Sequence, residues 1–378
     1  DGLYHAYNTL EIRKDKLNIG SLYPMLEGQV AALSAGAIEP QEAITVLEGL
    51  FASEVFREDQ SSFMLYPDRK LPGFLEKNRI PADDVAAIPL LQQMLDCDDH
   101  RIVVQDLDGN YRFNADFTNV GDLHDRLDAL ADTYGDSISA ARDQLHRLFE
   151  TVFNHQAFTG RSGTMFGFEG LGCIYWHMVS KLLLAVEENY FAALDSGAED
   201  AICKRLGELY YRVREGIGFN KTPAEYGAFP TDPYSHTPRH NGARQPGMTG
   251  QVKEEVLARF GELGIRVSNG LVSVQPALLR AQEFLSSPKE FCYLDVDGNW
   301  QDLTIPKHGL AFTWCQVPVI YCLDDGADPT LTITRDDGSS ETLQELALSA
   351  EDSSALFERN GRIRKLNVTI RNSDLLAT

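Results

Sequence analysis

The sequence predicts a mainly helical protein that ends in a small antiparallel β-sandwich. Through residues 1–288 apolar side chains recur every three to four positions, which is typical of amphipathic helices. From about residue 289 the pattern changes to short β-rich runs with turn signals such as Asp297-Gly298. The chain of 378 residues is long enough for two or three domains. We therefore predict a helical domain with long functional loops at 1–288 and a β-sandwich domain at 289–378.

The helical region shows about nine amphipathic segments. In residues 24–35, Leu26, Val30 and Leu33 share one face. Residues 171–194 are apolar almost all round, which predicts a buried helix. The helices alternate in pairs, as in a bundle, solenoid or toroid. The remaining helices are predicted at residues 40–53, 83–95, 122–133, 137–153, 201–213, 251–263 and 277–284.

Strands are predicted mainly in the C-terminal part. One earlier hairpin is indicated by residues 101–105 and 111–114, which flank Asp108-Gly109. The C-terminal strands are predicted at residues 291–296, 300–305, 310–314, 317–321, 331–335 and 363–370.

Composition excludes several classes of protein. With 34 basic and 56 acidic residues the net charge is −22, which disfavours binding to nucleic acid and to anionic lipid. No run of 18 apolar residues predicts a membrane span, and no signal peptide is seen, so we expect a cytoplasmic protein. The six cysteines form no C-x-x-C pair. Serine-hydrolase, P-loop, Rossmann and zincin motifs are also missing, and we expect no cofactor and no metal.

The first segment with chemical character is residues 159–172. It holds five glycines and leads directly into the predicted buried helix, so its backbone could approach a ligand closely. Glu169 lies just before that helix, whose positive end favours the ionised carboxylate. Glu169 is therefore a candidate catalytic base or an acceptor for sugar hydroxyls, and the alternative is a helix-capping carboxylate. Arg161 in the same segment is a candidate substrate ligand.

The second segment is residues 216–248, where five prolines prevent regular structure. Its basic residues are unusual in so acidic a chain and indicate an anionic ligand. Arg239, Arg244, Thr249 and Gly250 are candidate phosphate ligands, with Thr249 as the cap of the helix at 251–263. The alternative is that the arginines pair with structural carboxylates. Further candidates in this segment are Glu225 and Asp232 for catalysis, and Tyr234, His236, His240 and Gln245 for substrate binding.

A third group of candidates comes from the first 70 residues. Glu27 follows Tyr23 near an apolar helix stripe, where it is either a buried acid or a link between helices. Residues 63–69 combine aromatic and charged side chains in a loop that could line a cleft. Tyr66, Asp68 and Arg69 in this loop are candidate substrate ligands, as is Tyr23.

The order of the later segments resembles a known group of enzymes. A helical region ends in residues 246–253, an inner helix follows, then residues 270–276 and a β-sandwich. This order resembles the C-terminal part of α/α-barrel carbohydrate-active enzymes, namely inverting glycoside phosphorylases and related glycoside hydrolases. The resemblance implies an α/α barrel or toroid, incomplete here, which an upstream domain or a separate chain would complete. In those phosphorylases a Thr-Gly loop helps to hold phosphate, and Thr249-Gly250 matches it.

We therefore expect a carbohydrate-active enzyme that cleaves or phosphorolyses a glycosidic bond by single displacement. One carboxylic acid would protonate the leaving oxygen, while water or bound phosphate attacks the opposite face of the sugar. Glu169 with Glu27 is the first candidate pair and Glu225 with Asp232 the second. The partners would be an oligo- or polysaccharide and, in the phosphorolytic version, inorganic phosphate. The alternatives are a non-catalytic carbohydrate-binding or assembly module, and a polysaccharide lyase that uses Tyr234, His236 and Arg239.

Overall fold

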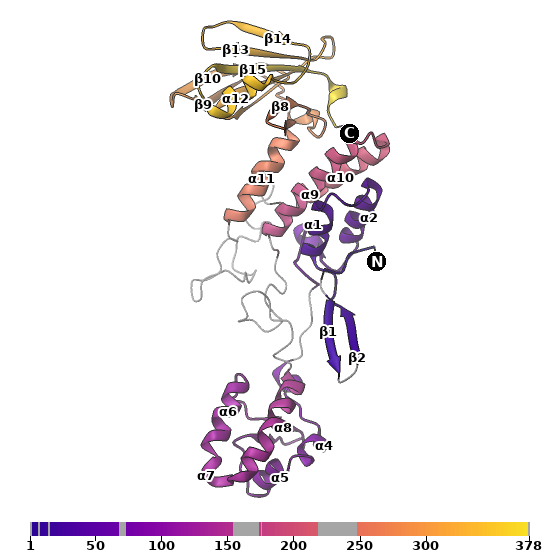
Figure 1. Cartoon of the computed structure of the whole chain (residues 1–378), viewed down its shortest axis with the longest axis vertical. Coiled ribbons are helices and arrows are strands. Elements are labelled where there is room, and N and C mark those ends of the chain that lie inside the picture. The colour runs from indigo at the N-terminus through magenta and orange to yellow at the C-terminus, as the bar shows by residue number, and fades with distance from the viewer. Residues whose placement is uncertain are drawn as a thin grey trace. The chain divides into compact units, whose positions relative to one another are not determined.

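The structure is a computed structural model that describes residues 2–6, 8–13, 16–67, 73–153, 174, 176–217 and 248–376. It divides into two compact units (Figure 1). One comprises Asp1–Pro67 and Cys173–Thr378, and the other, Asp68–Gly172, is inserted between them. The predicted boundary between residues 288 and 289 stays a prediction.

The inserted unit has a hydrophobic core of its own. Phe113 packs against Phe149 with ring centroids 5.1 Å apart, and buried Asn78 exchanges two 2.8 Å hydrogen bonds with the backbone of Phe113. The single helix predicted at 83–95 is two helices, because Pro89 begins a new one. The elements are α3 (Phe74–Lys77), α4 (Ala82–Ala86), α5 (Pro89–Asp96), β5 (Val103–Gln105), β6 (Tyr111–Phe113), α6 (Val120–Ala129), α7 (Ala131–Tyr134) and α8 (Asp136–Phe153).

Five helices form the helical part of the first unit. Helix α9 packs against the other four and buries twelve of its residues, so the predicted buried helix is confirmed. Asn189 of α9 donates to the carbonyl of Leu33, near the end of α1, at 2.9 Å. The helices are α1 (Leu26–Ser34), α2 (Pro40–Phe51), α9 (Trp176–Asp195), α10 (Asp200–Glu215) and α11 (Met248–Glu262).

The predicted α/α barrel or toroid is wrong: within the described residues the helices close no ring. A ring would place each helix between two neighbours around a central axis, whereas here α9 occupies the middle of the group. The helices of 73–153 are also not available to such a ring, because their apolar faces pack into a separate core.

The predicted β-sandwich is wrong as well. The C-terminal part has one five-stranded sheet in the order β11-β12-β15-β13-β14, with β12 and β15 parallel. Its apolar face shares a core with Leu279, Phe284 and Leu356, and with Val272 and Val274 of a short two-stranded hairpin. Helix α12 (Ala350–Glu358) connects the last two strands in the chain and contacts the final one. The strands are β11 (Gly309–Trp314), β12 (Val317–Leu323), β13 (Thr330–Arg335), β14 (Ser340–Leu343) and β15 (Ile363–Ile370).

Several smaller elements complete the first unit. Strands β9 (Lys289–Leu294) and β10 (Trp300–Ile305) form a separate hairpin. The helix predicted at 277–284 is wrong, since Arg280 is extended and only a 3-10 turn follows it, at Ala281–Glu283. Near the insertion, a β-bridge joins Met64 to Ile174. The remaining strands are β1 (Asn8–Arg13), β2 (Lys16–Ser21), β3 (Phe56–Arg57), β4 (Ser62–Phe63), β7 (Ile265–Ser268) and β8 (Leu271–Val274).

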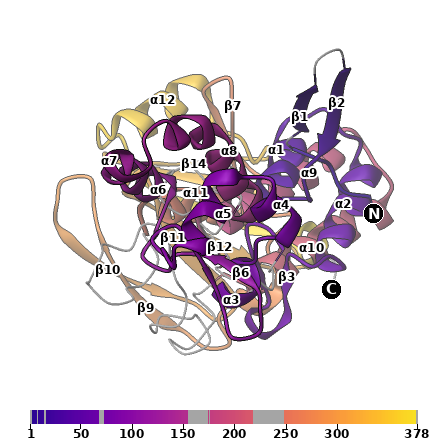
Figure 2. The ribbon, with the colours of Figure 1, turned by 90° about the horizontal axis from the view of Figure 1, so that it is seen from below.

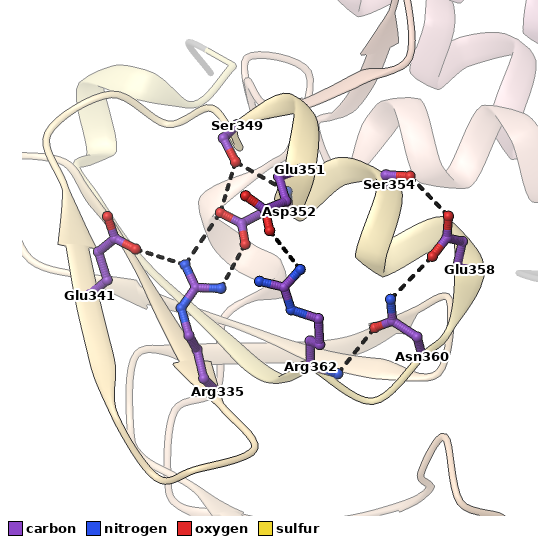
Figure 3. Close-up of polar contacts among 9 residues, drawn as sticks. All are labelled: Arg335, Glu341, Ser349, Glu351, Asp352, Ser354, Glu358, Asn360 and Arg362. Carbon is purple, nitrogen blue, oxygen red and sulfur yellow. Dashed lines mark hydrogen bonds and ion pairs between the residues drawn. The ribbon is translucent and has the colours of Figure 1, made fainter.

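A polar network fastens α12 to the edge of the sheet (Figure 3). Ser349 caps the helix by accepting from the backbone N–H of Asp352 at 3.1 Å. Arg335 on β13 donates to Asp352 at 2.6 Å and to Glu341 on β14 at 2.7 Å. The Arg335 guanidinium thereby links two strands to the first turn of the helix.

This network predicts an acid-sensitive contribution to stability. The hydrogen bonds from Arg335 hold the pKa of Asp352 below its usual range. A lowered pKa in the folded state stabilises the fold above the ordinary aspartate pKa of about 4, and this contribution is lost as the pH falls. Asp352→Asn should therefore lower the free energy of unfolding by about 1–3 kcal/mol at pH 7 and by much less near pH 3.

Urea unfolding at both pH values measures this effect. The control is Glu351→Gln, which removes an exposed ion pair with Arg362 and should cost about 1 kcal/mol or less. An equal loss for Asp352→Asn at pH 7 and pH 3 would show that its charge is not the cause.

Candidate functional site

Most of the predicted site residues lie outside the described residues and stay predictions. Of the catalytic candidates only Glu27 is described, half-buried in the first turn of α1. The backbone of Thr249 and Gly250 is described within the first turn of α11. Those outside are Glu169, Glu225, Asp232, Asp68, Arg69, Arg161, Tyr234, His236, His240, Gln245, Arg239 and Arg244.

The segments singled out in the first 70 residues lie together. The rings of Tyr23 and Tyr66 are 5.7 Å apart, and the N–H of Leu26 donates to the carbonyl of Leu65 at 2.8 Å. Tyr66 is only 2% exposed, so its ring belongs mainly to the protein interior. Buried Gln29 holds the start of the chain here by hydrogen bonds of 2.8 and 2.6 Å to the backbone of Tyr4.

Helices α9 and α11 also pack against each other, with the start of α9 beside the second turn of α11. His177, the second residue of α9, places its Nε2 3.8 Å from Oε1 of Glu254 on α11. These two helices follow the glycine-rich and proline-rich segments of the sequence. The start of the helix that follows the glycine-rich segment therefore lies beside the second turn of the helix that follows the proline-rich segment.

A buried carboxylate lies at this place, close to one lysine and one histidine. Glu254 is 4% exposed, and among the described residues its Oε2 has no hydrogen-bond partner. Nζ of Lys253 lies 3.5 Å from Oε1 of the same carboxylate. Burial lowers the pKa of His177, Lys181 and Lys253 lower it further, and Glu254 opposes them. The group thus places one cation, Lys253, and the imidazole of His177 beside a carboxylate, and Oε2 of Glu254 can accept from hydroxyl groups.

A pocket of about 960 Å³ lies between α10 and α11. At its base is Glu262, which is fully buried and accepts from the hydroxyls of Tyr210 at 2.9 Å and Tyr211 at 3.1 Å. Arg214 approaches the same carboxylate at 3.2 Å, and Arg259 also pairs with it.

Several charges in this pocket pair with one another. Besides Glu262, Arg259 binds Glu283 at 2.6 Å, and Arg280 stacks on the ring of Tyr211 at 3.3 Å. Burial raises the pKa of both tyrosines, which keeps them protonated as donors. We interpret this network as the structural link between α10, α11 and the segment that follows α11. Sequence reasoning missed it, although Arg259 and Glu262 have the spacing of a helical ion pair.

A second buried carboxyl lies between α9 and α11. Glu187 is 5% exposed, and within the described part of the chain its Oε2 has no hydrogen-bond partner. Burial, with the nearby charge of Glu262, raises its pKa to about 9. Gly261 makes room for it, since a Cβ there would stand 1.9 Å from Oε1 of Glu187.

Comparison with protein families identifies the inserted unit. Residues 71–156 match the family model described as GH149 phosphorylase insertion domain 2. This match relates the chain to glycoside phosphorylases. It falls within the compact unit Asp68–Gly172, so the family match and the fold delimit the same region independently. No curated protein matches the chain.

None of the helices in the described residues is long and apolar enough to cross a bilayer. The match concerns an insertion domain, so it assigns no catalytic residue.

Proposed function

We propose that this chain takes part in the phosphorolysis of a glycosidic bond in an oligo- or polysaccharide. The observation that carries the proposal is the match of residues 71–156 to an insertion domain of a phosphorylase. In the reaction, a phosphate oxygen forms a bond to the anomeric carbon while the bond to the leaving oxygen breaks. A carboxylic acid protonates that oxygen, and the products are a sugar 1-phosphate and a shortened saccharide.

Phosphate would bind at the start of α11. The helix begins at Met248, so Thr249 lies within its first turn and not at the cap that the sequence suggested. First-turn N–H groups have no partner within the helix and suit an anion. Lys253, in the second turn of the same helix, adds a cation. Arg239 and Arg244 remain the predicted ligands from the preceding segment.

The catalytic carboxylates remain predictions. Glu169 with Glu27, and Glu225 with Asp232, are the candidate pairs. Glu254 is an additional carboxylate that the sequence did not single out. Its buried position beside His177 suits it to accept from a sugar hydroxyl and to orient the imidazole.

Phosphate-dependent turnover tests the proposal. The chain is incubated with a panel of oligosaccharides, with and without phosphate, and sugar 1-phosphate is measured. Lys253→Ala should raise the KM for phosphate about tenfold or more, because a charged contact to phosphate is worth about 1.5–3 kcal/mol. The matched control is Lys289→Ala on β9, which should leave that KM unchanged.

Turnover that does not depend on phosphate would contradict phosphorolysis. A complete lack of turnover, with saccharide binding retained, would favour the second candidate, a non-catalytic carbohydrate-binding or assembly module. That candidate is supported because the matched family model describes an insertion domain. No described residue supports the lyase alternative, since Tyr234, His236 and Arg239 lie outside the described residues.

A further inference from the structure

A second polar cleft, of about 380 Å³, lies in the C-terminal part of the chain. It is formed by the β9–β10 hairpin together with the ends of β12 and β15 in the five-stranded sheet. Figure 2 shows β9 and β10 as an extended hairpin. The side chains that matter below are those of Tyr293, Asp297, Asn299, Gln301, Gln316 and Arg364.

The turn of the hairpin is held rigidly by Asp295. Its Oδ1 accepts from the backbone N–H of Asp297 at 3.0 Å and of Asn299 at 2.8 Å. Gln301 donates to its Oδ2 at 2.9 Å, and Gln316 donates to its carbonyl at 3.1 Å. The hydrogen bonds to its carboxylate hold the pKa of Asp295 below its usual range, the bond from Asn299 most of all. The cleft is thus preorganised, which lowers the entropic cost of binding.

Several polar groups in this cleft have no hydrogen-bond partner among the described residues and are available to a ligand. Among the described residues, no hydrogen bond engages the amide of Asn299, the hydroxyl of Tyr293 or the side-chain carbonyls of Gln301 and Gln316. Tyr293 also presents a flat apolar ring, which stacks on Phe291 with centroids 5.8 Å apart and an angle of 11°. The cleft therefore combines one aromatic face with several uncharged donors and acceptors.

The charge of the cleft disfavours an anionic ligand. Among the described residues that line the cleft, Asp295 and Asp297 carry negative charge and Arg364 alone carries positive charge. Arg364 already pairs with Asp297. A neutral ligand that has both an apolar face and a rim of hydroxyls satisfies the ring and the amides together. The volume lies at the small end of the range for small-molecule sites.

We propose that this cleft binds a neutral saccharide unit, with the sugar ring stacked on Tyr293 and its hydroxyls bound by Asn299, Gln301 and Gln316. The site is distinct from the start of α11 and does not depend on the proposed phosphorolysis. It holds a saccharide without reacting with it.

Calorimetric titration of the full chain in phosphate-free buffer tests the site. The probes are glucose hexasaccharides with 1,3-, 1,4- or 1,6-linkages. At least one should bind saturably, and Tyr293→Ala should weaken that binding tenfold or more. Asn299→Ala, which breaks no hydrogen bond of its side chain within the described structure, should weaken it several-fold with an unchanged Tm.

Trp300→Ala is the matched control on the same hairpin. Trp300 pairs across the strands with Leu294, on the face opposite Tyr293, and is 73% exposed. Its loss should change the affinity less than twofold. Lack of binding by every probe, or binding that Trp300→Ala removes and Tyr293→Ala spares, would overturn the proposal. Because phosphate is absent, neither outcome bears on phosphorolysis.

Discussion

Glu262→Ala is expected to lower the free energy of unfolding by about 3–5 kcal/mol, the usual cost of removing one partner from a buried ion pair. The carboxylate of Glu262 faces Arg214 and Arg259 and accepts from two tyrosine hydroxyls. Without this carboxylate, the two buried tyrosine hydroxyls lose the acceptor that they share. Arg214 and Arg259 also lose much of the negative charge that neutralises them. Glu262→Gln should cost less, because the amide oxygen can still accept from one of the hydroxyls.

Urea unfolding followed by circular dichroism measures the loss. Glu48→Ala is the control, since Glu48 pairs with Arg205 at 2.9 Å on the surface and about half of each side chain is exposed. Such exposed pairs contribute about 1 kcal/mol or less. Similar losses for Glu262→Ala and Glu48→Ala would show that the network between α10 and α11 is not the link described above.

Glu187→Met is expected to stabilise the protein, by about 2–4 kcal/mol at pH 8. The pKa of Glu187, raised by burial to about 9, means that the folded state keeps a proton that the unfolded chain releases above its ordinary pKa of about 4.3. Stability is therefore lost as the pH rises from about 4.3 to 9. Methionine has a similar unbranched shape and no charge, so it avoids this loss.

The pH dependence distinguishes this cause from simple packing. The difference in stability between Glu187→Met and the parent should be small near pH 5 and should grow up to pH 9. Glu188→Gln is the control, because its side chain is exposed on the same helix and should change stability by less than about 0.5 kcal/mol. A gain that is equal at pH 5 and pH 8 would contradict a buried, protonated Glu187.

The periodic pattern of the sequence predicted individual elements well. Helices α1, α2 and α8–α11 follow apolar stripes that are local, and so do the hairpin β5–β6 and most C-terminal strands. Their assembly depends on which stripes meet, and local patterns carry no such information. The inserted unit buries the apolar stripes of α5, α6 and α8 in its own core, so these helices cannot belong to the ring that the family resemblance implied.

The same limit applies to the candidate site. Thr249 and Gly250 were noticed because a short motif marks them. His177 and Glu254 carry no motif, and only the packing of α9 against α11 brings them within 3.8 Å. Glu187 likewise becomes noteworthy only beside Gly261, where a missing side chain leaves room for its carboxyl.

The bridge between Met64 and Ile174 has a consequence for how such a chain could have arisen. The bridge joins the backbone of the first unit close to both positions where the inserted unit, Asp68–Gly172, is connected to it. Removal of the inserted unit would therefore leave two ends that a few residues could link. The first unit would then keep its hydrophobic core unchanged. An ancestral protein without the inserted unit, or a descendant with a different insertion, could therefore keep the same fold in the first unit.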